Sequence, residues 1–183
     1  MLSIRSARTS DVQAIAHVDV ETWRTTYPGM LPDDLLTALD PRQRARQWSR
    51  FIAQRPDDAV LAFDEQDRVL VGFGSCGIQR ETVLPYAGEI FTLYVGPDFQ
   101  GQGVGRQLLL ALFQRMVRGG LSSAMLWVLA ANPARFFYER VGGRRIAARQ
   151  LDMGPFGVPA VAYGWPDLAE TIDRAAQARS RIE

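Results

Sequence analysis

The chain has 183 residues, of which 47% are hydrophobic and 22% charged, a length and composition that suit one globular domain. Its formal net charge is only +1, so no broad basic field exists to hold nucleic acid through its phosphates. One cysteine, Cys76, and one histidine, His17, exclude an internal disulfide and a cluster of Cys or His metal ligands. We expect no metal and no nucleic-acid partner.

The N-terminus indicates where the protein works. Arg5 and Arg8 interrupt the first residues before the apolar segment of a signal peptide could form, and no run approaches the length of a membrane span. These features predict a cytoplasmic protein with no membrane partner.

The first third of the chain alternates a short strand with helices. Residues 3–7 are typical of a strand, and Ser10 with Asp11 can cap the helix that follows. His17 falls within the apolar pattern of this helix, which favours a structural role for it. Pro28-Gly29 ends the helix and a short one follows near residues 33–39. Pro41 then starts another, whose arginines are expected to form a solvated face: Arg42, Arg44, Arg46, Arg50 and Arg55.

Strands dominate the middle of the chain. Residues 59–64 and 68–77 flank a polar turn, a pattern that predicts an antiparallel hairpin, and residues 89–95 supply the next strand. Cys76 lies in the hairpin, where it is expected to be a small buried hydrophobe rather than a nucleophile.

The second half of the chain predicts a β-α-β crossover followed by two more strands. An apolar helix over residues 106–117 precedes the nearly continuous apolar run 123–129, which fits a buried strand. A helix begins after Pro133, and two strands follow around a Gly/Pro turn at 144–151 and 158–165. We therefore predict a single α/β domain with a mixed sheet over residues 1–166, and a polar, helix-compatible tail over 167–183.

Three alternating glycines stand between a strand and a helix. Residues 100–105 read Gln-Gly-Gln-Gly-Val-Gly, and the helix after them begins near Arg106. Glycines let the backbone approach an anion without a Cβ in the way, and the unpaired N–H groups of a helix N-terminus attract negative charge. This segment, the glycine bend, predicts a site for a nucleotide-like diphosphate.

Two common phosphate loops do not match the glycine bend. A Walker loop needs a lysine ahead of Ser or Thr, and the chain contains no lysine. A dinucleotide fingerprint needs a third glycine where Arg106 stands, and an acidic residue about twenty positions later that is missing here.

The segment resembles the acetyl-CoA signature of the GNAT N-acetyltransferase superfamily, R/Q-x-x-G-x-G/A, at Gln100, Gly103 and Gly105. Residues 89–99 resemble the family's fourth strand and its approach to the bend, and residues 132–143 resemble its second signature, N-P-A-x-x-F-Y-E-x-x-G. Two signatures in the right order and at the right separation make the resemblance specific.

The resemblance implies a fold and a co-substrate. The fold is a central mixed, mostly antiparallel sheet flanked by helices, with a β-α-β core that binds acetyl-CoA between strands that pair and then splay apart. Backbone groups of Leu93, Tyr94 and Val95 would bond the pantetheine and acetyl ends. Asn132 would bond the pantetheine or cap the helix after it. The diphosphate would lie on the bend, at Gln100, Gly101, Gln102, Gly103, Val104, Gly105 and Arg106.

The resemblance also implies catalytic roles. Tyr138 matches the tyrosine that protonates the leaving thiolate, its alternative being a buried helix tyrosine with a wet hydroxyl. Glu89 would take a proton from the amine directly or through water. The alternatives are a surface glutamate at the edge of the strand, with another carboxylate or water as the base. The N–H of Val95 would stabilise the negative charge on the thioester oxygen.

The implied activity is transfer of acetyl from acetyl-CoA to a primary amine of a small molecule or peptide, by direct attack in a ternary complex. The segment bearing Trp23, Tyr27, Met30 and Pro32 resembles an acceptor loop, or is a staple for helix packing. The acceptor itself stays open, and dimers are common in the family. A second function class is a catalytically idle acetyl-CoA sensor, against which the presence of both Tyr138 and Glu89 argues.

Overall fold

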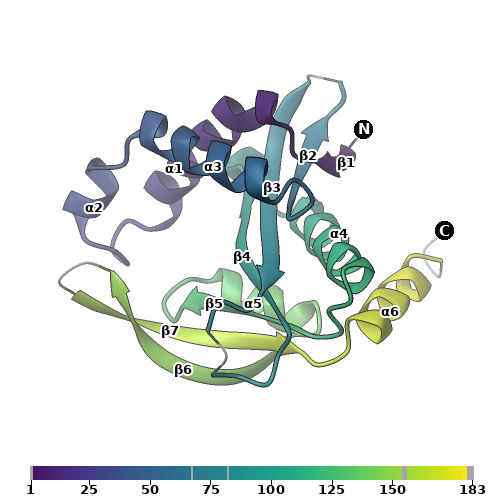
Figure 1. Ribbon diagram of the computed structural model, residues 1–183. Coiled ribbons are helices and arrows are strands. Elements are labelled where there is room, and N and C mark those ends of the chain that lie inside the picture. The colour runs from purple at the N-terminus through teal and green to yellow at the C-terminus, as the bar shows by residue number, and fades with distance from the viewer. Residues whose placement is uncertain (1, 67, 82, 154–155, 181–183) are drawn as a thin grey trace. The chain divides into compact units, whose positions relative to one another are not determined.

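Seven strands form one sheet in the computed structural model, which describes residues 2–66, 68–81, 83–153 and 156–180 (Figure 1). Their order across the sheet is β1-β2-β3-β4-β5-β7-β6. The pair β4 and β5 is parallel, whereas β1 with β2, β2 with β3, β5 with β7 and β6 with β7 are antiparallel. The strands are β1 (Leu2–Ser6), β2 (Ala59–Asp64), β3 (Val69–Ile78), β4 (Gly88–Val95), β5 (Ala124–Leu129), β6 (Arg144–Met153) and β7 (Phe156–Trp165).

Helices lie in the connections from β1 to β2, from β4 to β5 and from β5 to β6, and one follows β7. The predicted mixed, mostly antiparallel α/β sheet flanked by helices is confirmed. They are α1 (Val12–Thr26), α2 (Asp33–Thr37), α3 (Pro41–Gln54), α4 (Val104–Arg118), α5 (Ala134–Arg140) and α6 (Leu168–Ser180), with short 3-10 turns η1 (Thr9–Asp11) and η2 (Pro97–Phe99). The tail predicted at 167–183 is helical through Ser180, and residues 181–183 lie outside the described part. That residues 1–166 make a single catalytic domain stays a prediction.

The chain divides into two compact units. Unit 1 comprises Met1–Ser75 and Thr92–Leu112, and unit 2 comprises Cys76–Phe91 and Phe113–Glu183. Strands β3 and β4 and helix α4 therefore contribute residues to both units. Each unit has its own apolar core.

The core of unit 1 lies where α1 and α3 pack side by side (Figure 1). Ile15 of α1 and Leu61 of β2 are fully buried, and the Trp48 ring of α3 meets the Phe73 ring of β3 edge-on at 5.1 Å. Large aromatic side chains bury the most apolar area per residue, so this pair anchors the helices on the strands.

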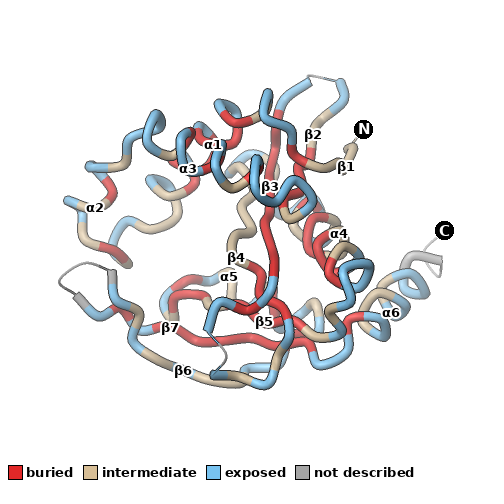
Figure 2. Tube along the Cα trace, in the orientation of Figure 1, coloured by how far each residue is buried: buried red, intermediate tan, exposed pale blue. Residues whose placement is uncertain are grey.

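The core of unit 2 is formed by β5, β7 and the second half of α4. The tube of Figure 2 is buried along most of β5 and the second half of β7, whereas most of α6 is exposed. Phe113 and Trp165 are buried with ring centroids 5.2 Å apart. Leu168, also fully buried, fixes the start of α6 to this core.

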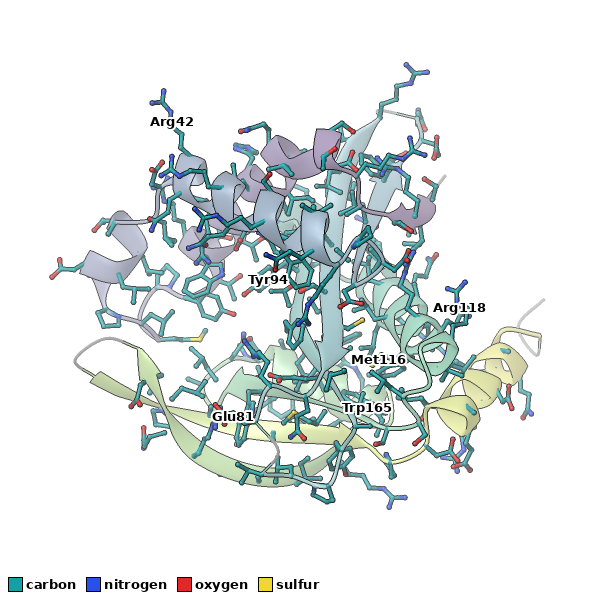
Figure 3. The ribbon with its side chains drawn as sticks, in the orientation of Figure 1. Arg42, Glu81, Tyr94, Met116, Arg118 and Trp165 are labelled. Atoms are coloured by element: carbon teal, nitrogen blue, oxygen red, sulfur yellow. The ribbon has the colours of Figure 1, made fainter. Side chains whose placement is uncertain are left out.

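Three expectations about individual residues were wrong. Asp11 does not cap α1 with its side chain, because its carboxylate accepts hydrogen bonds from Arg5 and from the N–H of Arg8. His17 lies on the exposed face of α1, 3.9 Å from Glu21, and so outside the apolar pattern in which the sequence placed it. Arg44 is not part of the solvated face of α3, because its guanidinium packs over the Trp23 ring. Arg42 does point outward from this helix, as Figure 3 shows.

Candidate functional site

The glycine bend adopts the conformation that its glycines predict. Gly101 and Gly103 have φ values of 74° and 82°, a region that residues with a Cβ rarely adopt. A Cβ at either position would meet no atom within 4 Å, so the backbone conformation, not crowding within the chain, requires glycine. Helix α4 begins at Val104, directly after the second of these glycines. Its first N–H groups lie at the bend, where an anion can accept from them.

Two glutamine side chains brace the bend. The Gln100 amide donates to the carbonyl of Val95 at 3.0 Å, and the Gln102 amide donates to the carbonyl of Asp98 at 2.8 Å. The bend is therefore tied to the end of β4 and to η2. The sequence predicted both glutamines as cofactor-binding residues but did not reveal this bracing. Pre-organised donors bind an anion better than a loop that must be ordered first.

The end of β4 is more accessible than its start. Gly88, Glu89 and Ile90 are buried, whereas Leu93, Tyr94 and Val95 are only half-buried. Strand β4 pairs with β5 at the start of both strands, where Gly88 lies opposite Ala124 and Glu89 lies opposite Met125. The predicted thioester-binding backbone thus lies beyond the parallel pairing.

An aromatic and polar cluster in unit 1 holds the Tyr94 side chain. The Trp23 indole N–H donates to the Tyr94 hydroxyl at 3.0 Å, and the Trp23 ring meets the Tyr27 ring edge-on at 5.1 Å. Burial raises the pKa of the Tyr94 phenol well above its ordinary value, with Tyr27 and Asp19 adding to the rise. The phenol therefore stays protonated at neutral pH. Tyr94 lies on β4, as labelled in Figure 3.

A buried carboxylate, Asp19, is linked to this cluster through Trp48 and Arg44. Asp19 is 3% exposed and accepts a 2.9 Å hydrogen bond from the Trp48 indole N–H. The Arg44 guanidinium lies 3.9 Å from the same carboxylate and 4.8 Å from the Trp23 ring centroid. Burial raises the pKa of Asp19, partly opposed by Trp48 and Arg44. No local sequence pattern predicted this cluster, because its members come from α1, α3 and β4.

Tyr138 is fixed in unit 2 by its neighbours on α5 and β7. Its side chain is 7% exposed, and its ring centroid lies 5.3 Å from Phe137 and 6.3 Å from Trp165. A Cβ on Gly143 would lie 2.7 Å from Trp165, so only glycine lets the chain after α5 pass so close. The Gly-Gly pair of the second signature thus sets how α5 carries Tyr138.

Next to it, Glu139 accepts a 2.5 Å hydrogen bond from the Tyr163 hydroxyl, and burial together with this carboxylate raises the pKa of Tyr163. The side-chain carbonyl of Asn132 accepts from the N–H of Ala134 at 2.9 Å, which is the capping role that the sequence allowed. The pantetheine role of Asn132 stays a prediction.

Glu89 is a buried carboxylate whose ion pair with Arg80 the sequence did not reveal. Its side chain is 4% exposed, and its two oxygens accept three hydrogen bonds from Arg80. The donors are the backbone N–H at 3.1 Å, Nε at 3.1 Å and Nη2 at 2.5 Å. The bond to Glu89 raises the pKa of the Arg80 guanidinium, although burial opposes the rise. The role of Glu89 as a base stays a prediction.

Each unit therefore holds part of the predicted site. The residues predicted to bind the acetyl, pantetheine and diphosphate groups at 93–95 and 100–106 lie in unit 1, whereas Glu89, Asn132 and Tyr138 lie in unit 2. In the part of the chain that the structure describes, no three Cys, His, Asp or Glu side chains gather as a metal site, and no helix has the length and apolarity to cross a bilayer.

Comparison with known proteins identifies the class to which these features belong. A family model described as "Acetyltransferase (GNAT) family" matches residues 19–143. A Bacillus subtilis (strain 168) protein described as an uncharacterized N-acetyltransferase, YuaI, is 32% identical over 169 residues, which are 92% of this chain and 95% of that protein. The chain therefore belongs to the acetyltransferase (GNAT) family and is an acyltransferase of that family.

Solved structures share the fold at low sequence identity. The PaiA N-acetyltransferase of Thermoplasma acidophilum, in complex with coenzyme A, superposes with a TM-score of 0.67 at 20% identity over 90% of this chain and 99% of its own. YncA of Salmonella typhimurium, a putative acetyltransferase with its cofactor acetyl-CoA, gives a TM-score of 0.68 at 20% identity over 92% and 94%. The predicted GNAT-type fold is thereby confirmed.

Proposed function

We propose that the protein transfers acetyl from acetyl-CoA to a primary amine by direct attack of the amine in a ternary complex. The observation that carries the proposal is the glycine bend, where Gly101 and Gly103 at positive φ lead directly into the N-terminus of α4. Backbone N–H groups so arranged suit the diphosphate of coenzyme A. Membership of the GNAT family and relatives with coenzyme A or acetyl-CoA bound support it.

Each step of the transfer has a proposed residue. The backbone at 93–95 bonds the pantetheine and acetyl ends, and the N–H of Val95 stabilises the oxyanion as the amine attacks. Tyr138 then donates its phenolic proton to the sulfur of the leaving thiolate. Glu89, directly or through water, accepts the proton that the amine loses, for which one of its bonds from Arg80 must give way. The amide group of Asn132 bonds the pantetheine.

One observation favours the second function class, a sensor that binds acetyl-CoA without turnover. Both oxygens of Glu89 accept hydrogen bonds from Arg80, so in this conformation Glu89 is not free to accept a proton from an amine. An enzyme in which water serves as the base is equally consistent with that pair. Turnover, not binding, decides between the two classes.

The deciding experiment is an acceptor screen with acetyl-CoA that follows free thiol and product mass together. We expect thiol and acetylated product to appear in equal amounts with at least one class of amine. Acetyl-CoA binding without thiol release across a broad amine panel would favour the sensor. A cytoplasmic location, a small-molecule or peptide acceptor and a homodimer remain proposals of the same kind.

A variant of Tyr138 tests the acid role within this reaction. Tyr138→Phe keeps the buried ring but removes the phenolic proton, so kcat should fall about 100-fold or more while acetyl-CoA affinity stays nearly unchanged. The matched control is Phe137→Tyr, which adds one hydroxyl to the adjacent half-buried ring where Tyr138→Phe removes one. This control should keep most of the activity. Equal kcat in Tyr138→Phe and wild type would remove Tyr138 from the mechanism.

A further inference from the structure

A hollow in unit 2 combines charged and aromatic walls. Its volume is about 170 Å³, and it is lined among others by Arg80, Glu81, Glu89, Met125, Trp127 and Arg149. These residues come from the segment after β3 and from β4, β5 and β6, so residues far apart in the sequence meet here. Glu81 is labelled in Figure 3 beside the ribbon of β6.

One of the two arginines in the hollow is already paired with a buried carboxylate. Arg80 offers the edge formed by Nε and Nη2 to both oxygens of Glu89, and its guanidinium lies 4.7 Å from the Phe91 ring centroid. This two-point geometry is the one in which guanidinium and carboxylate interact most strongly. Arg80 and Glu89 therefore form one wall of the hollow.

The other arginine is held in place but is less completely paired. Arg149 lies over the Trp127 ring at 4.2 Å from the centroid, and its Nη1 bonds Glu81. The Nε atom of Arg149 is buried and has no hydrogen-bond partner among the described residues. A buried donor left unpaired is unfavourable, so an acceptor atom that reached Nε would gain more than an ordinary surface contact.

The partner that Arg149 has is one that a ligand can displace. The Glu81 side chain is 57% exposed, and Arg149 holds the pKa of this carboxyl below its ordinary range. Ion pairs between exposed groups are weak because water and salt screen them. A ligand carboxylate in the guanidinium plane can bond the edge formed by Nε and Nη2, in the geometry that Arg80 shows toward Glu89. The exposed Glu81, which is bonded only at Nη1, can move aside for it.

The charge balance of the hollow favours one class of amine over another. Arg80 and Arg149 are matched by Glu81 and Glu89, so these four groups carry no net charge. An aminocarboxylate is neutral overall and keeps this balance, whereas a polyamine adds positive charge beside two guanidinium groups. The small volume agrees, because drug-sized ligands occupy pockets of about 300–1,000 Å³.

From these observations we propose that the hollow binds the carboxylate of the acceptor through Arg149, so that the acceptor is a small amino acid or a similar aminocarboxylate. This inference rests on the proposed function, since it names the amine that the transferase uses. Glu89 lines the same hollow, so an amine anchored through its carboxylate stays beside the proposed base. The half-buried Trp127 supplies apolar surface for the carbon chain between the two groups.

The test compares acceptors that differ only in the carboxylate. Each standard α-amino acid is assayed with acetyl-CoA beside its primary amide, and diamines and polyamines form a third group. We expect kcat/KM to be about 10- to 100-fold higher for the best acid than for its amide, the range for a hydrogen-bonded charge. Arg149→Gln should remove this preference, and Arg149→Lys, which keeps the charge but loses the fork, should reduce it.

Two further variants separate the role of Arg149 from a general effect on β6. Arg144→Gln changes an exposed arginine on the same strand and should leave the preference intact. Glu81→Gln removes the competing carboxylate and should lower KM for the acid acceptor. A thermal shift of the enzyme with the N-acetylated acid, present in wild type and lost in Arg149→Gln, gives a readout that does not need turnover.

The outcomes distinguish this inference from the proposed function. Acetylation of no amine at all would contradict the proposed function, while transfer to amines with equal kcat/KM for acid and amide would overturn only the role of the hollow. Preference for polyamines, an unchanged preference in Arg149→Gln, or a higher KM for the acid in Glu81→Gln would also overturn it. If Arg149→Gln does not fold, the result of Arg149→Lys decides.

Discussion

The glycine bend and the hollow around Arg149 are two ways of building a site for an anion. The bend uses backbone N–H groups at the start of α4, and its glycines contribute only their freedom to adopt positive φ. The hollow uses side chains, each held by a partner from another strand. A backbone site tolerates few substitutions at its glycines but many around them, whereas a side-chain site depends on every member of its network.

The largest expected effect lies in the side-chain network. Arg80→Gln leaves the Glu89 carboxylate buried without its cation, and removing one member of a fully buried pair costs about 3–5 kcal/mol. Because the Arg80 side chain is 63% exposed, we expect a smaller loss, about 2 kcal/mol in the free energy of unfolding measured with urea. Acetyl-CoA affinity should not change, since the bend needs no part of this pair.

Two controls define that result. The double variant Arg80→Gln with Glu89→Gln should regain part of the stability, because no charge is then left unpaired. Arg42→Gln on the exposed face of α3 should change stability by less than about 0.5 kcal/mol. A loss in Arg80→Gln no larger than in Arg42→Gln would show that the pair contributes no stability.

A comparable effect is expected at the bend, where acetyl-CoA binding should weaken in addition to a loss of stability that a control variant shares. Gly103→Ala places a Cβ at a φ of 82° and beside the proposed diphosphate, so acetyl-CoA affinity should fall about 10- to 100-fold in calorimetry. Gly120→Ala is a matched control at the other end of α4, because Gly120 has a φ of 83° and also has no atom within 4 Å of a Cβ.

Both glycine variants should lose a similar amount of stability, about 1–2 kcal/mol, because both force alanine into the left-handed region. Only Gly103→Ala should lose affinity for acetyl-CoA. Equal affinity in the two variants would separate the bend from coenzyme binding.

The smallest effect concerns the pH dependence of unit 1. Burial raises the pKa of Asp19, so between its value in the unfolded chain, about 4, and its raised value, the native state holds more protons than the unfolded state. The free energy of unfolding therefore falls as pH rises through this window. Asp19→Asn keeps an acceptor for the Trp48 indole but cannot ionise, so it should lack this fall.

The measurement is the difference in unfolding free energy between Asp19→Asn and wild type across the pH range above 4. We expect the difference to shift in favour of the variant as pH rises. A difference that stays constant with pH would show that Asp19 is ionised with its ordinary pKa in the folded protein.

The two anion sites also differ in how far the sequence could predict them. The bend was predictable, because the spacing of Gly101, Gly103 and Gly105 before a helix is local and positive φ strongly favours glycine. The start at Pro41 of α3 was predictable for the same local reason. The fold class followed from periodicity and from the two signatures.

The hollow and the cluster of Trp23, Tyr27 and Tyr94 were not predictable, because their contacts join residues that are distant in the sequence. Arg149 and Glu81 are 68 positions apart, and Trp23 and Tyr94 are 71 apart. Nothing local marked Arg44 as different from the exposed arginines around it. Arg80 and Glu89 are only nine apart, yet the intervening turn hides their pairing from any periodic pattern.

The most direct test of the glycine bend as a coenzyme site is calorimetry of the pure wild-type protein with acetyl-CoA, free coenzyme A and nucleoside triphosphates. A coenzyme site at the bend predicts heat of binding for both forms of coenzyme A, reduced in Gly103→Ala but not in Gly120→Ala, and little for the triphosphates. No heat for either form of the coenzyme, with tight binding of nucleoside triphosphates, would contradict it.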